Sequence, residues 1–232
     1  DILANLDKEF EWLHIIYNSE NVGYFQGLND GLEYVEDNFK SLDFVVVGNN
    51  DLLVPKDFIS SIQAHSDTLS KHFVTCPNII SADAKHQNPH VIHGFSKLRW
   101  AVWELYYSSY QISRLVLSCA KLLGDLGARK DRNQHSSARE IAAGYGACYI
   151  LNNDFRQSCR RLFMPTFLMQ EEYFLSYQLK KFNQRPYYLP DIRISHVEHA
   201  TVKKIPKRKI WQYERDSFRM MKKLERDAQV YH

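Results

Sequence analysis

One short segment constrains the fold more than any other. Residues 42–47 read Leu-Asp-Phe-Val-Val-Val and have polar turns on both sides. An apolar run this short and rich in β-branched side chains predicts a strand buried on both faces of a parallel sheet. The run ends in Gly48-Asn49-Asn50-Asp51. Because ligands of open α/β sheets gather beyond the carboxyl ends of the strands, Asp51 lies where a ligand is expected.

The rest of the chain alternates between helical and strand patterns. A glycine-punctuated loop at 21–31 leads into an amphipathic helix that ends near Phe39. The apolar spacing predicts further strands at 13–17, 73–80, 141–151, 185–190 and 192–196, and helices at 2–13, after Pro55, and at 96–123, 152–162 and 172–182. We therefore expect one α/β domain over residues 1–200, followed by a basic helical extension over 201–232.

Composition limits the classes of partner. The chain has 232 residues, of which 44% are hydrophobic and 25% charged, as in ordinary globular proteins. Its net charge of +3 is too small to favour a nucleic-acid partner. No apolar run approaches the length of about 18 residues that a membrane span needs. Four cysteines lack metal-ligand spacing and are expected to be small buried apolar residues in a reducing compartment, the cytoplasm: Cys76, Cys119, Cys148 and Cys159.

Carboxylates and an imidazole follow the predicted strands and loops. They are Asp51, the pair Glu171 and Glu172, and His196. A divalent cation that holds a diphosphate needs few protein ligands, since phosphate oxygens and water fill its other positions, so one carboxylate and one imidazole suffice. A further carboxylate near an acceptor hydroxyl could remove its proton as a general base.

Each of these residues also has a structural interpretation. An aspartate after a strand is commonly a turn residue or a helix cap. Two adjacent glutamates are typical of a solvated helix start, where the helix dipole favours negative charge. A single histidine is commonly a satisfied core or surface residue. The order and spacing of these residues, together with the glycine-rich loop, favour the functional interpretation.

Four sequence blocks, in the same order, resemble family-2 glycosyltransferases of the rhamnosyltransferase-like branch, which have the GT-A fold. Residues 21–31 and 49–51 resemble the family pattern N-x-G-(F/Y)-x-x-G-x-N-x-G followed by N-x-D. Residues 143–151 resemble its small-residue acceptor-side strand, residues 170–179 its E-D-x-D-L-x-x-R-L helix start, and residues 188–196 its Y-x-P-x-x-x-x-x-H ending. The resemblance implies a mixed α/β sheet with helices on both faces.

The resemblance also implies roles for individual residues. Asp51 and His196 would bind Mg²⁺ or Mn²⁺, and the metal would offset charge on the departing nucleoside diphosphate. Glu172 would be the base for inverting attack, with Glu171 in the same site; Glu172 stands where the family usually has Asp. The cofactor side, which binds the nucleotide-sugar donor, would be lined by Asn21, Gly23, Gly27, Asn29, Asn49 and Asn50.

Two further expectations concern the ends of the chain. Family members begin with a base-gripping strand and loop and a second strand, and neither precedes Asp1. The resemblance therefore implies that the GT-A domain is truncated at its N-terminus. The tail beyond Lys203 is basic and helical, which is usually a solvated face but could contact anionic lipid at the inner face of the cell membrane.

The 96–123 helix carries an aromatic stripe, Trp100, Trp103, Tyr107 and Tyr110, at helical spacing. The simplest expectation is packing on the sheet; the alternative is an interfacial position in a membrane.

The sequence thus predicts an inverting, metal-dependent glycosyltransferase of cell-surface polysaccharide synthesis. It would transfer sugar from a nucleotide-sugar donor to a hydroxyl of a glycan or a lipid-linked acceptor. The rival hypothesis is an inactive GT-A-like binding or scaffold domain. A nucleotidyltransferase is disfavoured because the glycine-rich phosphate loop with a basic residue, expected at the start of such a chain, is missing.

Overall fold

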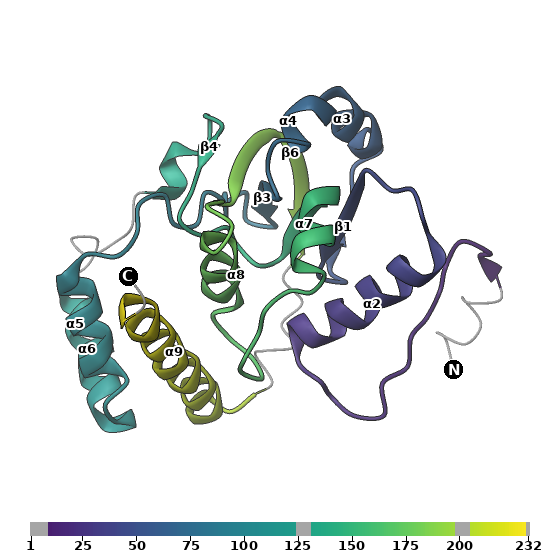
Figure 1. Cartoon of the computed structure of the whole chain (residues 1–232). Helices are drawn as coiled ribbons and strands as arrows, with labels where there is room; N and C mark the ends of the chain where they lie inside the picture. The colour runs from purple at the N-terminus through teal and green to yellow at the C-terminus, as the bar shows by residue number, and fades with distance from the viewer. Residues whose placement is uncertain (1–8, 124–130, 198–204, 231–232) are drawn as a thin grey trace.

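The chain forms a mixed six-stranded sheet covered by helices on both faces (Figure 1). The computed structural model describes residues 9–123, 131–197 and 205–230. The strands are β1 (Phe44–Gly48), β2 (Leu52–Leu53), β3 (Val74–Ser81), β4 (Arg139–Glu140), β5 (Cys148–Asn152) and β6 (Tyr187–His196). Their order is β1-β5-β3-β6-β2, and β4 pairs with β6. Only the β3–β6 pair is parallel among the named strands.

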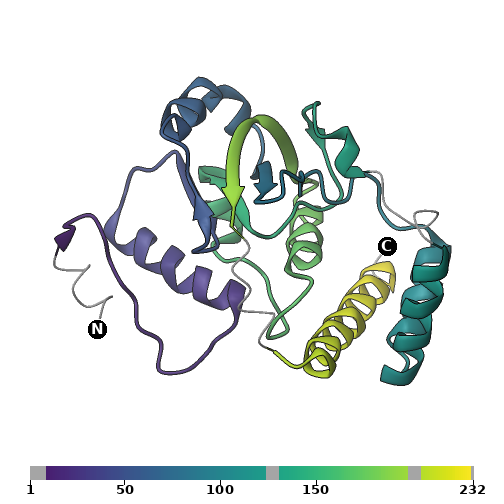
Figure 2. The same cartoon turned by 180° about the vertical axis from the view of Figure 1, so that it is seen from behind.

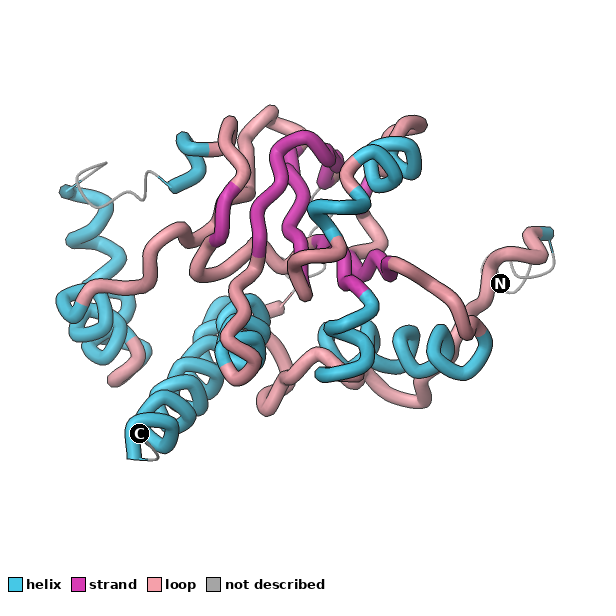
Figure 3. The backbone as a smooth tube through the Cα atoms, turned by 45° about the horizontal axis from the view of Figure 1, so that its top comes forward, coloured by secondary structure: helices cyan, strands magenta, loops and turns pink. Residues whose placement is uncertain are grey.

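The helices lie in two layers against the sheet and in a third group beside it. They are α2 (Tyr24–Asn38), α3 (Phe58–Ala64), α4 (Ser66–Leu69), α5 (Lys97–Tyr106), α6 (Tyr110–Leu123), α7 (Asn153–Cys159), α8 (Glu171–Lys180) and α9 (Lys207–Val230), with a 3₁₀ turn η2 (Asp131–Gln134). Figures 1 and 2 show α3 and α4 at one end, α2, α7 and α8 below the sheet, and α9 with the α5–α6 pair farther out. The backbone tube in Figure 3 shows the strands at the centre of the molecule.

Strand β5 shows why the sheet needs cover on both sides. All five of its residues are buried. Tyr149 and Leu151 face a core built with α2, α7 and α8, whereas Cys148 and Ile150 face a second core built with α3 and α4. Alternation with a period of two, apolar on both faces, places the strand in the middle of the domain. This confirms the predicted α/β fold with helices on both faces.

The apolar run at 42–47 has a different environment from the one predicted. β1 pairs only with β5, antiparallel, among the described residues, and Val46 is 41% exposed. It is therefore a half-buried strand at the edge of the sheet. The strand itself was predicted correctly, but its predicted burial on both faces and its predicted parallel neighbours were wrong. The predicted strand at 13–17 is also absent, since these residues have no regular structure.

Several boundaries also differ from the prediction. Helix α2 begins at Tyr24, so the predicted glycine loop lies mostly inside the helix. The expected helix 96–123 divides at residues 107–109, because Ser109 accepts a hydrogen bond from the N–H of Ile112 and begins a new helix. Residues 141–147 are not strand, and the two expected strands over 185–196 are the single strand β6.

The aromatic stripe packs on α9 rather than on the sheet. Tyr107 is buried with Trp211 and Phe218 of α9, and Trp100 and Trp103 pack against this cluster. Trp100 and Phe218 have ring centroids 5.4 Å apart. The α5–α6 pair and α9 thus share an aromatic core with Phe174 of α8. The predicted basic tail is a helix from Lys207 onward, with residues 198–204 outside the described residues.

Two further findings concern cysteines and helix length. Cys76 and Cys148 are buried as expected and Cys159 is partly buried, but Cys119 is exposed on α6, so that expectation fails for Cys119. In the part of the chain that the structure describes, no helix combines the length and apolarity that crossing a bilayer requires.

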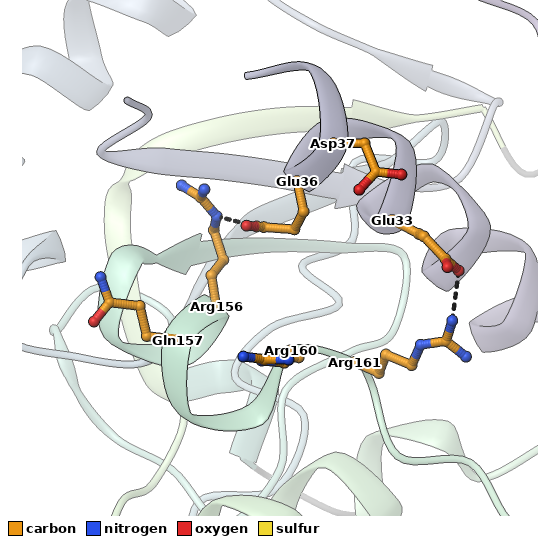
Figure 4. A pocket seen from close by; sticks show the side chains of 7 residues that line it. All are labelled: Glu33, Glu36, Asp37, Arg156, Gln157, Arg160 and Arg161. Carbon is orange, nitrogen blue, oxygen red and sulfur yellow. Dashed lines mark hydrogen bonds and ion pairs between the residues drawn. The ribbon is translucent and has the colours of Figure 1, made fainter. Parts of the chain in front are cut away.

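Ion pairs fasten α2 to α7 across a cleft of about 490 Å³ (Figure 4). The Arg156 guanidinium donates to Glu36 at 2.6 Å and to the carbonyl oxygen of Leu42 at 2.6 Å, and Arg161 pairs with Glu33. Arg156 is only 6% exposed, and a buried cation is costly unless it is paired. Glu36 and the carbonyl oxygen of Leu42 supply that pairing. The cleft therefore has a structural role in holding the edge strand and helix α2 in place.

Candidate functional site

Two residues that are far apart in the sequence meet at one edge of the sheet. Asp51 follows the turn after β1, and His196 is the last residue of β6, directly opposite Leu52 of β2. The Oδ1 atom of Asp51 lies 3.1 Å from Nε2 of His196. The side-chain amide nitrogen of Asn49 lies 3.4 Å from the same imidazole atom. The structure therefore brings together the two predicted metal ligands and one predicted donor-side residue.

Gln87 fixes which nitrogen of His196 faces this site. Its Oε1 lies 2.9 Å from Nδ1 of His196, and both residues are buried. An amide oxygen can only accept, so Nδ1 donates the hydrogen, and in a neutral imidazole Nε2 then turns its lone pair toward Asp51. A lone pair facing a carboxylate is unfavourable unless a cation or a proton lies between them. This arrangement fits a divalent cation.

The described residues nevertheless supply only a small set of ligands. Across residues 9–123, 131–197 and 205–230, no group of three or more His, Cys, Asp and Glu side chains has metal-binding geometry. A cation here would have one carboxylate and one imidazole from the protein, with its remaining positions open to other oxygen ligands. Such open coordination is typical of a hard cation that shares its ligands with a phosphate.

The two predicted catalytic glutamates begin helix α8. They follow Met169 and Gln170, which both have left-handed backbone conformations, with φ of 77° and 64°. The Glu171 carboxylate accepts a hydrogen bond of 2.8 Å from the N–H of Met169. Burial, together with the neighbouring charge of Glu172, raises the pKa of Glu171 to about 7. Left-handed residues beside a carboxylate with a raised pKa are typical of a functional site.

Glu172 faces a histidine that the sequence patterns did not single out. Nε2 of His90 lies 3.6 Å from Oε1 of Glu172, and both side chains are 18% exposed. The other ring nitrogen of His90 is buried and has no hydrogen-bond partner within the described ranges. Glu172 is therefore held beside a titratable ring at the edge of solvent, a suitable environment for a residue that exchanges protons.

Aromatic rings connect the aspartate–histidine pair to the glutamates. The ring of Tyr145 is 6.1 Å from His196 and 5.7 Å from His90, between ring centroids. The pKa of Tyr24 is raised by burial and also by the charges of Glu171 and Asp51, so Tyr24 lies near both carboxylates. Its hydroxyl donates to the carbonyl oxygen of Gly146 at 2.8 Å. The predicted metal ligands and the predicted base thus border one site.

Of the other residues predicted for the cofactor side, one is buried in the core and others are exposed. Asn29 is buried in the core, where its side chain accepts from the N–H of Leu162 at 2.7 Å and donates to the Leu162 carbonyl oxygen at 3.0 Å. Its amide is therefore occupied by the backbone and does not line the site. Gly27 is exposed within α2, and Asn50 is exposed in the turn before Asp51.

Asn21 and Gly23 form the entry to α2. The Asn21 side chain accepts from the N–H of Gly23 at 3.1 Å. Gly23 has φ of +87°, and a methyl group there would lie 2.1 Å from the carbonyl oxygen of Phe167. This contact presses the start of α2 against the loop that precedes the glutamates. Gly23 is thus required by backbone conformation and close packing.

Three residues of the site were not predicted from the sequence or had no role assigned to them: Gln87, His90 and Tyr145. Gln87 and His90 belong to an irregular segment that follows β3. Most of this segment has no periodic pattern of apolar residues. The sequence therefore does not indicate which strand end a polar residue in the segment will face. Tyr145 stands in a block with a family resemblance, yet its ring position between two histidines follows only from the packing.

The architecture is a mixed α/β fold of the GT-A type, with polar side chains collected at the strand ends. A structure described as GalNAc-T7 with UDP, GalNAc and Mn²⁺ is similar to this chain, with a TM-score of 0.54 and 11% sequence identity. The match covers 88% of this chain but only 36% of that one, so the chain spans about a third of its neighbour. No protein-family profile matches the sequence, and no curated protein matches it significantly.

Proposed function

We propose that this chain is the catalytic domain of an inverting glycosyltransferase that uses a divalent metal and a nucleotide-sugar donor. The observation that carries the proposal is the 3.1 Å approach of Asp51 to His196, with the imidazole tautomer set by Gln87. The GT-A-type fold supports it, as does the similarity to GalNAc-T7, whose structure holds UDP and Mn²⁺. Residues 1–200 would form the transferase domain, and residues 201–232 its helical extension.

Asp51 and His196 would hold Mg²⁺ or Mn²⁺ at the edge of the sheet. When bound, the ion supplies positive charge that stabilises the departing nucleoside diphosphate. Gln87 contributes by keeping a proton on Nδ1 of His196, so that Nε2 stays available as a ligand. The donor would extend past Asn49, whose side chain already contacts the imidazole. Of the other residues predicted for the donor side, Asn50 is exposed in the turn before Asp51 and would be available to it.

Glu172 would remove the proton from the acceptor hydroxyl. It is partly exposed and therefore reachable by an acceptor. Glu171 is more suited to a supporting role, because its carboxylate is engaged by the N–H of Met169 and its pKa of about 7 keeps a share of it protonated at neutral pH.

The acceptor would be a hydroxyl of a glycan or a lipid-linked sugar in cell-surface polysaccharide synthesis. Four cysteines without disulfides among the described residues support a reducing, cytoplasmic location. Exposed basic side chains at the start of α9, among them Lys207, Arg208 and Lys209, are the proposed contact with the inner face of the membrane.

A thermal-unfolding titration with Mn²⁺ and UDP tests the metal and donor site. We expect stabilisation by the two together, of about 2.7 kcal/mol when free ligand is 100 times its Kd. Asp51→Ala and His196→Ala should abolish it, whereas Asp43→Ala, an exposed aspartate before the same strand, should keep it. A screen in which no nucleoside diphosphate stabilises the wild-type protein would favour the inactive scaffold domain.

The base assignment needs a separate measurement. Glu172→Gln should keep the stabilisation by Mn²⁺ and UDP but lose sugar transfer, by a factor of about 100 to 10,000. Retention of the full transfer rate would show that another group takes the proton.

A further inference from the structure

A second polar and aromatic groove lies outside the aspartate–histidine site. It has a volume of about 450 Å³ and runs between α6 and α9. Figures 1 and 2 show these helices beside each other at the side of the sheet. The side chains on which its chemistry depends are Tyr106, Tyr110, Arg114, Lys207, Trp211 and Glu214. None of them belongs to the motifs that define the predicted donor side.

The aromatic rings of the groove are held in fixed positions. Tyr110 and Trp211 meet edge to face, with ring centroids 5.6 Å apart and planes at 68°. The indole N–H of Trp211 donates to the carbonyl oxygen of Tyr106 at 3.3 Å. Tyr106 and Tyr110 are half-buried, so part of each ring stays accessible. Ordered and partly exposed aromatic faces of this kind suit flat, apolar ligand surfaces such as the faces of a sugar ring.

The charges of the groove favour an anionic ligand. Arg114 on α6 and Lys207 on α9 are both exposed and line opposite walls. Arg208 adds a third cation 6.0 Å from the ring of Tyr110. The only acidic lining residue is Glu214, which has no hydrogen-bond or ion-pair partner among the described residues. Burial and the charge of Glu172 raise the pKa of Glu214. The balance is therefore positive.

Glu214, which lines the groove, lies within electrostatic reach of the proposed base. Glu172 lies near enough for its charge to act on Glu214, and Glu214 acts in the same way on Tyr107. The Tyr107 hydroxyl accepts a hydrogen bond of 2.9 Å from the side chain of Gln170, which directly precedes the two glutamates. Glu214 and Tyr107 thus form a link between the groove and the start of α8.

We propose that the groove between α6 and α9 binds an acceptor sugar chain that carries an anionic group, either a carboxylate or a phosphate. The ring of Tyr110, held edge to face by the buried Trp211, would pack on a sugar face, and Arg114 and Lys207 would bind the anionic group. The ligand's role as the acceptor depends on the proposed transferase function, whereas the binding of an anionic sugar to the groove does not. The α5–α6 pair and α9 would therefore supply the acceptor site.

Titration of the full chain by isothermal calorimetry tests this inference. Three probes separate the candidate chemistries: tetragalacturonate carries carboxylates, glucose 6-phosphate carries a phosphate, and maltotetraose is neutral. We expect one of the two anionic probes to bind at least tenfold more tightly than maltotetraose. Arg114→Ala should weaken that binding at least fivefold, whereas Arg226→Ala, an exposed arginine elsewhere on α9, should leave it unchanged.

Ring contacts are tested at Tyr110. Tyr110→Ala should lose binding, and Tyr110→Phe, which keeps the ring, should retain it. Asp51→Ala should bind the anionic probe normally while losing the response to Mn²⁺ and UDP, so the two proposals can fail separately. The inference is overturned if neither anionic probe binds, if maltotetraose binds equally well, or if Arg114→Ala and Tyr110→Ala both bind like the wild type.

Discussion

Replacing Glu171 with glutamine should make the protein more stable at pH 8 but not at pH 4. Glu171 has its pKa raised from 4.5 to about 7, first by burial and then by the charge of Glu172. Between pH 4.5 and about 7, Glu171 keeps its proton in the folded protein but has released it in the unfolded chain. The free energy of unfolding therefore falls as pH rises through this window.

The size of the effect follows from the shift. At 1.36 kcal/mol per pH unit, a rise from 4.5 to about 7 corresponds to a loss of about 3 kcal/mol in the wild-type protein above pH 7. Glutamine has no charge to bury, and its amide oxygen can still accept from the N–H of Met169. The variant should thus match the wild type near pH 4 and exceed it by about 1 to 3 kcal/mol at pH 8.

Urea denaturation followed by circular dichroism at pH 4.5, 6 and 8 measures this difference. Glu20→Gln, at an exposed position, serves as the matched control and should follow the wild type at each pH. Parallel curves for Glu171→Gln and the wild type, separated by the same free energy at every pH, would refute the conclusion that Glu171 is destabilised by its charge in the folded protein.

Three further substitutions test the supports of the site. Gly23→Ala should cost about 2 kcal/mol or more in unfolding free energy, since it adds a positive-φ penalty to a methyl group 2.1 Å from a carbonyl oxygen; wild-type stability would contradict this. Asn29→Ala should cost about 2 to 4 kcal/mol by chemical denaturation, because it leaves both backbone groups of Leu162 unpaired in the core. Gln87→Leu should weaken Mn²⁺ binding about tenfold in calorimetry while retaining the fold, because His196 loses the acceptor for its Nδ1–H; unchanged affinity would show that the tautomer is set otherwise.

The sequence predicted the local environment of the acidic residues better than it predicted the partners of the buried ones. Asp51 was predicted from its place after an apolar run, and Glu171 and Glu172 from their place at a helix start, and both local environments are present. Asn29 was assigned to the nucleotide side, yet it bonds the backbone of Leu162. A sequence motif records which residue occurs, but the partner of a buried amide depends on a segment 133 positions away.

The sequence by itself determined the α/β class, because alternating and continuous apolar runs dictate which segments must be buried. It also determined that acidic residues follow a strand and begin a helix. Only the tertiary structure decided that β1 lies at an edge, since a strand pattern does not specify its neighbours. It alone placed Asp51 3.1 Å from His196 and Gln87 behind the imidazole. Contacts between residues up to 147 positions apart arise from sheet pairing and core packing, which no local pattern encodes.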